Sequence, residues 1–177
     1  MSSDPKTQLV MTIIGPDRPG IVDARSREIK AHGGNWLESR MASLASHFAG
    51  ILLVEVPRAQ VDALCAALSS MERLSVKVTV VQSEVRAARE APRRVTLELT
   101  GIDQVGIVQA ITAALAAREV NIEELDTEIT TAPMSGEPTF NARARLLVPA
   151  SATLADLRQA LEQLGSHLMV DIELEEL

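Results

Sequence analysis

The chain contains one pattern of residues twice, and this internal repeat limits the folds that it can adopt. Residues 15–22, Gly-Pro-Asp-Arg-Pro-Gly-Ile-Val, recur at residues 101–108 as Gly-Ile-Asp-Gln-Val-Gly-Ile-Val. The similarity continues to Asn35 in the first copy and to Asn121 in the second. Such self-similarity indicates two copies of one structural unit.

A second pair of matching segments, at residues 48–57 and 140–149, shows that the second copy is longer. The additional residues fall at 132–138, where two prolines and a glycine predict a longer turn between two strands.

A segment between the two copies is charged, has little apolar periodicity and ends in a proline. It covers residues 84–92 and is predicted to be a linker, with a short exposed helix as the alternative. The expected domains are therefore residues 1–83 and 93–177.

The hydrophobic period changes several times within each copy and predicts the order of its elements. In the second copy, alternating Val95, Leu97 and Leu99 indicate a strand, and apolar residues at helical spacing follow the glycine-containing loop. Two further strands, a helix and a last strand complete the copy. Ser151 is the expected N-cap of that second helix, and Gly165 is its expected end.

The first copy predicts the same order, βαββαβ. Right-handed crossovers then place two helices on one face of a four-stranded antiparallel sheet. The expected fold class is α+β, with two ferredoxin-like units.

Composition excludes several classes of function. The 177 residues carry a net charge of −7, with a pI near 5.0, which disfavours direct binding of nucleic acid. Cys65 is the only cysteine, so no intramolecular disulfide can form. The first residues lack a basic stretch followed by an apolar core, and every apolar run is shorter than a membrane span. We expect a cytoplasmic protein without a membrane segment.

Residues 15–22, a helix and then residues 32–42, His-Gly-Gly-Asn-Trp-Leu-Glu-Ser-Arg-Met-Ala, resemble the start of an ACT domain of the glycine cleavage system transcriptional repressor type. The resemblance covers nearly the whole chain. It implies a regulatory protein, not an enzyme, that responds to an amino acid through contacts with a regulatory protein partner, commonly as a dimer, and it implies no cofactor. Two features depart from the family: Arg25 stands where the second copy has Ile111, and the loop at 101–106 lacks the prolines and the arginine of the first copy.

The loop between the first strand and the first helix is the predicted ligand site. Its glycines allow close approach to backbone N–H groups at a helix N-terminus, which suit the carboxylate of a small amino acid such as glycine or serine. An asparagine offers both donors and an acceptor to a zwitterion, and an aspartate suits its ammonium group. The predicted ligand-binding residues are Gly15, Pro16, Asp17, Arg18, Gly20, Ile21, Asn35, Asp103, Gly106 and Asn121.

A purely structural interpretation remains open for the same residues. The glycines and prolines can shape a tight turn, Asp17 can cap the helix, and Asn35 can occupy a left-handed turn. The second copy favours this structural interpretation. We expect Arg18 to be solvated, and Arg25 to extend its charged head into water or else to pair with an acid across an interface.

No catalytic residue or metal site is predicted. Cys65 lies on an apolar helix stripe and is expected to be an inert core residue, and His32 and His47 have no partner at ligand spacing. The competing functions are an acylphosphatase-like hydrolase on the same type of fold, a detached regulatory module of an enzyme such as formyltetrahydrofolate deformylase, and an assembly module without a ligand.

The strand at residues 48–56 is apolar on both of its faces. Helices cover only one face of such a sheet, so Ile51 and Leu53 are expected to need a cover, either from the other repeat or, preferably, from a second chain in a symmetric dimer. The equivalent positions of the second copy are the polar Asn141, Arg143 and Arg145.

Overall fold

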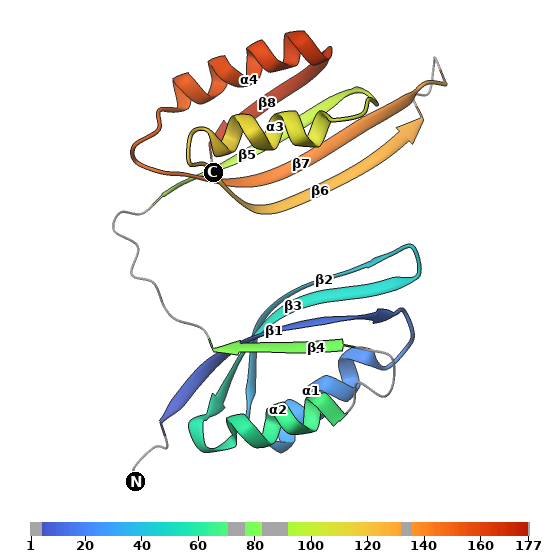
Figure 1. The fold of residues 1–177 in the computed structure, drawn as a ribbon, viewed down its shortest axis with the longest axis vertical. Coiled ribbons are helices and arrows are strands. Elements are labelled where there is room, and N and C mark those ends of the chain that lie inside the picture. Colours follow the sequence, from blue (N-terminus) through green and yellow to red (C-terminus); the bar gives the residue numbers. More distant parts are fainter. Residues whose placement is uncertain (1–4, 71–76, 83–91, 132–135, 177) are drawn as a thin grey trace. The chain divides into compact units, whose positions relative to one another are not determined.

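The chain forms two compact units, Met1–Arg86 and Ala87–Leu177 (Figure 1). The computed structural model describes residues 5–70, 77–82, 92–131 and 136–176. Most of the predicted linker at 84–92 therefore lies outside the described residues.

Each unit contains the predicted βαββαβ order. The elements of the first unit are β1 (Lys6–Pro16), α1 (Ile21–Ala31), β2 (Asn35–Leu44), β3 (His47–Pro57), a short 3-10 turn (Arg58–Gln60), α2 (Val61–Ser70) and β4 (Lys77–Gln82). Those of the second are β5 (Arg93–Ile102), α3 (Ile107–Ala116), β6 (Asn121–Thr131), β7 (Pro138–Val148), α4 (Leu154–Leu168) and β8 (Val170–Glu176).

The two sheets have equivalent topologies. Their strand orders are β2-β3-β1-β4 and β6-β7-β5-β8, and all neighbouring strands are antiparallel. In each unit both helices cover the same face of the sheet (Figure 1). The prediction of two ferredoxin-like units is confirmed.

Alternating apolar residues on the strands and helical stripes build one core per unit. The inner face of β1 buries Leu9, Met11 and Ile13, and Ile21 and Ile29 of α1 pack in the same cluster. In the second unit the core residues include Val95, Leu97, Leu99, Ile107, Ile111 and Leu115. The described core of each unit draws on residues of that unit alone.

The helix α4 corrects two predictions about its ends. Thr153, not Ser151, is the N-cap, since its Oγ1 accepts a hydrogen bond of 3.1 Å from the Asp156 N–H. Gly165 does not end the helix, which continues to Leu168 and is capped by Met169 in a left-handed conformation. Gly165 is buried, and a Cβ added there would lie 2.8 Å from the Val170 carbonyl oxygen. Close packing against β8 therefore explains this glycine.

The two hairpins differ as the sequence predicts. Ala45 and Ser46 alone connect β2 to β3, and both have positive φ, as a two-residue hairpin turn of type I′ requires. In the second unit Thr131 pairs with Pro138, so the connection is longer. Residues 132–135 of that connection lie outside the described part of the chain.

The capping correction generates a test. We expect Thr153→Ala to lower the free energy of unfolding by about 1 kcal/mol, because a backbone N–H at the start of α4 loses its acceptor. Ser151→Ala is the matched control and should change stability by less than about 0.5 kcal/mol. Thermal and urea unfolding followed by circular dichroism measures both. Equal effects of the two substitutions would contradict the assignment of Thr153 as the cap.

Candidate functional site

The loop between β1 and α1 lies at one end of the first sheet. Gly15 is buried near the end of β1 and pairs with Phe48, while Pro16 pairs with His47. Pro19 and Gly20 follow as exposed residues, and Ile21 begins the helix and is buried in the core.

Asp17 ties this loop to the β2–β3 hairpin. Its backbone N–H donates to the Ser46 carbonyl oxygen over 2.9 Å, and its Oδ2 accepts a 2.5 Å hydrogen bond from the Ser43 hydroxyl. No side chain caps α1, so the suggestion that Asp17 caps the helix is wrong. The carboxylate instead fixes the loop against the neighbouring turn.

The N-terminus of α1 presents uncapped backbone donors. Gly20 is the N-cap residue, with φ of 91°, a conformation that glycine adopts without strain. A Cβ placed on Gly20 would meet no atom within 4 Å, so there is open space beside the start of the helix. The partial positive charge of a helix N-terminus suits a carboxylate at this position.

The two arginines near this helix end have different environments. Arg18 is exposed. Arg25 is 2% exposed, so the prediction that its head extends into water is wrong. Its Nε and Nη2 are buried and have no hydrogen-bond partner among the described residues. Burial lowers the pKa of the Arg25 guanidinium, and the positive charge of Arg18 lowers it further.

The corresponding loop of the second unit is held differently. The Asp103 N–H donates to the Pro138 carbonyl oxygen over 3.1 Å, and the Gln104 side-chain amide donates to the Leu168 carbonyl oxygen. Gly106 is again a left-handed N-cap residue without a side-chain cap, with φ of 96°. The buried Ile111 takes the place that Arg25 has in the first unit.

Asn35 does not lie beside the loop of its own unit. It pairs with Glu55, which pairs with Gln8 near the start of β1, whereas the loop follows the other end of that strand. At about 3.3 Å per residue, the two ends are separated by about 23 Å. The crossover helix causes this separation, because it returns the chain to the end of the sheet where β1 began.

Asn121 has the equivalent position in the second unit, opposite Leu147 and far from Gly106. Both asparagines are exposed first residues of extended strands, so the left-handed turn suggested for Asn35 is wrong. That conformation is adopted by Gly33, which has φ of 70°.

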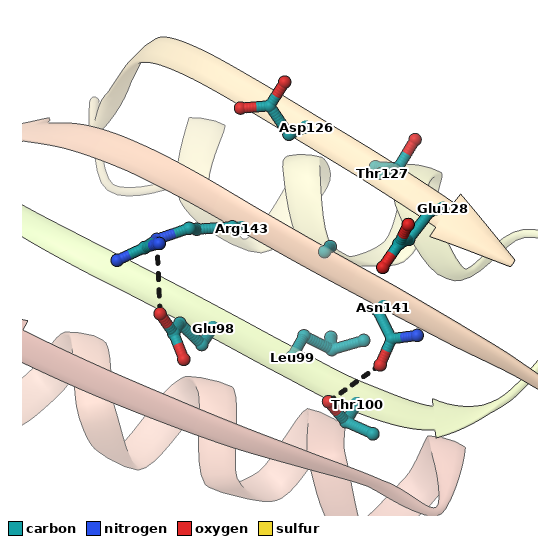
Figure 2. A pocket seen from close by; sticks show the side chains of 9 residues that line it. Glu98, Leu99, Thr100, Asp126, Thr127, Glu128, Asn141 and Arg143 are labelled. Atoms are coloured by element: carbon teal, nitrogen blue, oxygen red, sulfur yellow. Dashed lines mark hydrogen bonds and ion pairs between the residues drawn. The ribbon is translucent and has the colours of Figure 1, made fainter. Parts of the chain in front are cut away.

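A shallow hollow lies on the outer face of the second sheet, with a volume of about 510 Å³ (Figure 2). Arg143 Nε lies 3.2 Å from Glu98 Oε1, and the Thr100 hydroxyl donates to Asn141 Oδ1 over 3.2 Å. Asp126 and Glu128 add two further carboxylates. None of its lining residues belongs to the predicted site. The alternation of acids with Asn141 and Arg143 predicts a polar face, but not a hollow.

The cysteine and the two histidines considered in the sequence contact the core or the backbone of their own unit. Cys65 packs against the first core, and burial raises the pKa of its thiol, with a further increase from the Asp62 charge, as an inert cysteine requires. The Nδ1 atoms of His32 and His47 lie within hydrogen-bond distance of backbone carbonyl oxygens. The described residues contain no group of three or more His, Cys, Asp or Glu side chains that could hold a metal ion. In the same part of the chain, no helix is both long and apolar enough to span a membrane.

Comparisons with known proteins agree with this architecture. Residues 7–81 match the family model for the ACT domain. The glycine cleavage system transcriptional repressor of Escherichia coli (strain K12) is 28% identical over 163 residues, which cover 90% of this chain and 85% of that protein, and the repressor of Shigella flexneri matches equally. A crystal structure of an unknown protein from Galdieria sulphuraria is 32% identical, covers 98% of this chain and 99% of its own, and superposes with a TM-score of 0.88. These matches show that the first unit is an ACT domain, and the second unit repeats its βαββαβ fold.

Proposed function

We propose that this protein is an amino-acid-responsive regulatory protein that acts through contacts with a protein partner. The observation that carries the proposal is the uncapped start of α1, where Gly20 leaves open space beside oriented backbone N–H groups. Its relatives in Escherichia coli and Shigella flexneri are transcriptional repressors of the glycine cleavage system, which supports a regulatory role. The net charge of −7 favours a protein partner over direct contact with nucleic acid.

The ligand is proposed to be a small amino acid, with glycine or serine favoured. Its carboxylate accepts hydrogen bonds from the first turn of α1, and the loop held by Asp17 needs little ordering when the ligand binds. In the second unit the loop is tied to α4 through Gln104, and Ile111 replaces the arginine. The first unit is therefore the proposed site of response.

The two alternative functions, a hydrolase and an assembly module, require other features of the protein. An acylphosphatase-like hydrolase needs an arginine in a glycine-rich phosphate cradle, but Arg18 is exposed and the second loop has Gln104 bonded to a backbone carbonyl oxygen. An assembly module without a ligand predicts that no amino acid changes the stability of the protein, which a binding experiment separates from a sensor.

Glycine or serine should raise the melting temperature of the full chain. A ligand present at a hundredfold its dissociation constant stabilises the folded state by about 2.7 kcal/mol. Differential scanning fluorimetry with the standard amino acids measures the shift, and glycinamide, which lacks the carboxylate, is the matched control ligand. Asp17→Ala should weaken the response, because it removes the acceptor of the Ser43 hydrogen bond.

The amino-acid hypothesis fails if no standard amino acid shifts melting at millimolar concentration. Asn35→Ala adds a geometric test, because Asn35 lies at the opposite end of the sheet from the loop. An unchanged response places the whole site within one unit. A lost response indicates that Asn35 reaches the loop of a second copy.

We also propose that the outer face of the first sheet is covered by the same face of a second copy. Val10 is in register with both Leu53 and Val81, and a shallow groove of about 330 Å³ runs past Val10, Ile51 and Leu53. Ile51 is 48% exposed, Val81 is 60% exposed and Ile14, on the same face, is 53% exposed. Apolar side chains exposed together on one sheet face are typical of an interface.

The charge pattern supports a second copy as the partner of this face. Its margin carries the ion pair between Arg40 Nη1 and Glu38 Oε1, at 3.0 Å, and a two-fold axis can bring each of these residues near its opposite in the copy. The outer face of the second sheet is unsuitable, because Arg143 and Arg145 occupy the positions equivalent to Ile51 and Leu53 and form ion pairs with Glu98 and Glu124.

The double substitution Ile51→Arg with Leu53→Arg should convert a dimer into a monomer, because four buried guanidinium groups would face one another across the two-fold axis. Size-exclusion chromatography with light scattering measures the mass. Val105→Arg, an exposed apolar residue of the second unit, is the control and should leave the mass unchanged. A wild-type protein with the mass of one chain, or a double variant with the wild-type mass, would refute the proposed dimer.

A further inference from the structure

Arg25 is the one charged residue that is buried among the residues that the structure describes. It lies on α1 between Ile21 and Ile29, on the stripe that faces the core, and is 2% exposed. Arginine retains its charge even when its pKa is lowered, because its ordinary pKa lies far above neutral pH. A buried charge without a counter-ion destabilises the folded state. The first unit therefore retains a group that destabilises it unless something pairs with it.

The unpartnered atoms of Arg25 form a specific recognition edge. Nε and Nη2 are the two nitrogens without hydrogen-bond partners, and their N–H groups point in parallel from one side of the planar guanidinium. Two parallel donors in one plane match the two oxygens of a carboxylate, in the bidentate geometry that arginine forms with such groups. The acidic net charge of the chain disfavours a polyphosphate at the same place.

Arg25 lies in the N-terminal half of α1, four residues after the first residue of the helix. Helical side chains lean toward the N-terminus of their helix, so a residue four positions after Ile21 reaches over the first turn. The charge of Arg18, in the loop before the helix, acts on the guanidinium of Arg25. The uncapped backbone N–H groups beside Gly20 lie at the same end of α1. Arg25 and the uncapped backbone N–H groups therefore lie toward the same end of α1.

We propose that Arg25 binds the carboxylate of the ligand through its Nε and Nη2 edge, at the N-terminus of α1. The proposal rests on the amino-acid response proposed above, and it assigns that response to the first unit alone. In the second unit, Ile111 fills the equivalent core position and has no donor to offer. The two repeats share a fold but differ in their capacity to bind a carboxylate.

Substitution of Arg25 by methionine tests the assignment. Arg25→Met removes the charge and keeps a long side chain, and the presence of Ile111 in the other repeat shows that this position accommodates an apolar residue. Without a ligand, the variant should melt at the same temperature as the wild type or higher, because a buried unpaired charge is removed. Its affinity for glycine or serine, measured by isothermal titration calorimetry on the full chain, should fall at least about tenfold.

Two control variants and a comparison of anions test whether the loss of affinity is specific to the paired donors of Arg25. Arg27→Met removes an exposed arginine from the same helix and should bind as the wild type does. Arg25→Lys keeps the charge but not the paired donors, and should also lose most of the affinity. Sodium acetate, compared with sodium chloride and sodium phosphate at equal ionic strength, probes the carboxylate without an amino group.

The outcomes separate this proposal from the proposed function. If an amino acid stabilises the wild type and Arg25→Met equally, the amino-acid response stands and the role of Arg25 is refuted. If acetate stabilises the wild type but not Arg25→Met, while no amino acid acts, Arg25 binds carboxylates and the amino-acid response fails. Equal stabilisation by phosphate and acetate overturns the carboxylate assignment. If Arg25→Met unfolds, Arg25→Lys becomes the deciding variant: wild-type affinity in it overturns the proposal.

Discussion

The pairing of each central strand along both of its edges is the constraint on which both units depend. β1 and β3 are the two central strands of the first sheet and β5 and β7 those of the second, so none of these four strands has an edge to offer to another chain. Two helices then cover one face of each sheet (Figure 1). The outer sheet face, the outer edges of β2, β4, β6 and β8 and the loops remain for recognition, and the two repeats differ on the outer face and in the loop before the first helix. The first combines an apolar outer face with a proline-containing loop and Arg25, whereas the second combines a charged face with a loop tied to α4. The two units therefore share a fold, but the outer face of the first sheet is apolar and that of the second is charged.

Hydrophobic periodicity was sufficient to predict the order of the elements, because each strand and helix buries one face of its own residues. The alternation of Val95, Leu97 and Leu99, for example, matches their burial in the second core. The ends of α4 were less predictable. Ser151 and Thr153 are both suitable caps by residue type, and only the bond to the Asp156 N–H distinguishes them. Gly165 resembles a residue that ends a helix. A glycine is needed there because the helix packs closely against β8, and this tertiary contact cannot be recognised from the local sequence.

The candidate site was predicted in part, for reasons that differ between residues. The glycine-containing loop opens a helix as expected, whereas Asn35 follows the loop in sequence but is returned by the crossover to the opposite end of the sheet. For Arg25, two features of the sequence lead to opposite predictions. The charge of the side chain predicts exposure to solvent, whereas its position on the apolar stripe of the helix predicts burial in the core. The stripe prevailed, since α1 cannot turn Arg25 outward without exposing Ile21 and Ile29. The hollow beside Asn141 depends on the spacing of side chains across three strands, which the sequence does not specify.

The attachment of Asp17 to Ser43 and Ser46 has a mechanical consequence. Any ligand that displaces the loop must either carry the tip of the β2–β3 hairpin with it or break the two hydrogen bonds, one of which involves a carboxylate. Bonds of these kinds contribute about 0.5–1.5 kcal/mol when neutral and about 1.5–3 kcal/mol when charged. Ser43 and Asp17 are exposed, so solvent weakens the bond between their side chains. Leu44, next to Ser43, is largely exposed at this tip. A movement of the loop is therefore coupled to the tip of the hairpin, which presents an exposed apolar side chain to a protein partner.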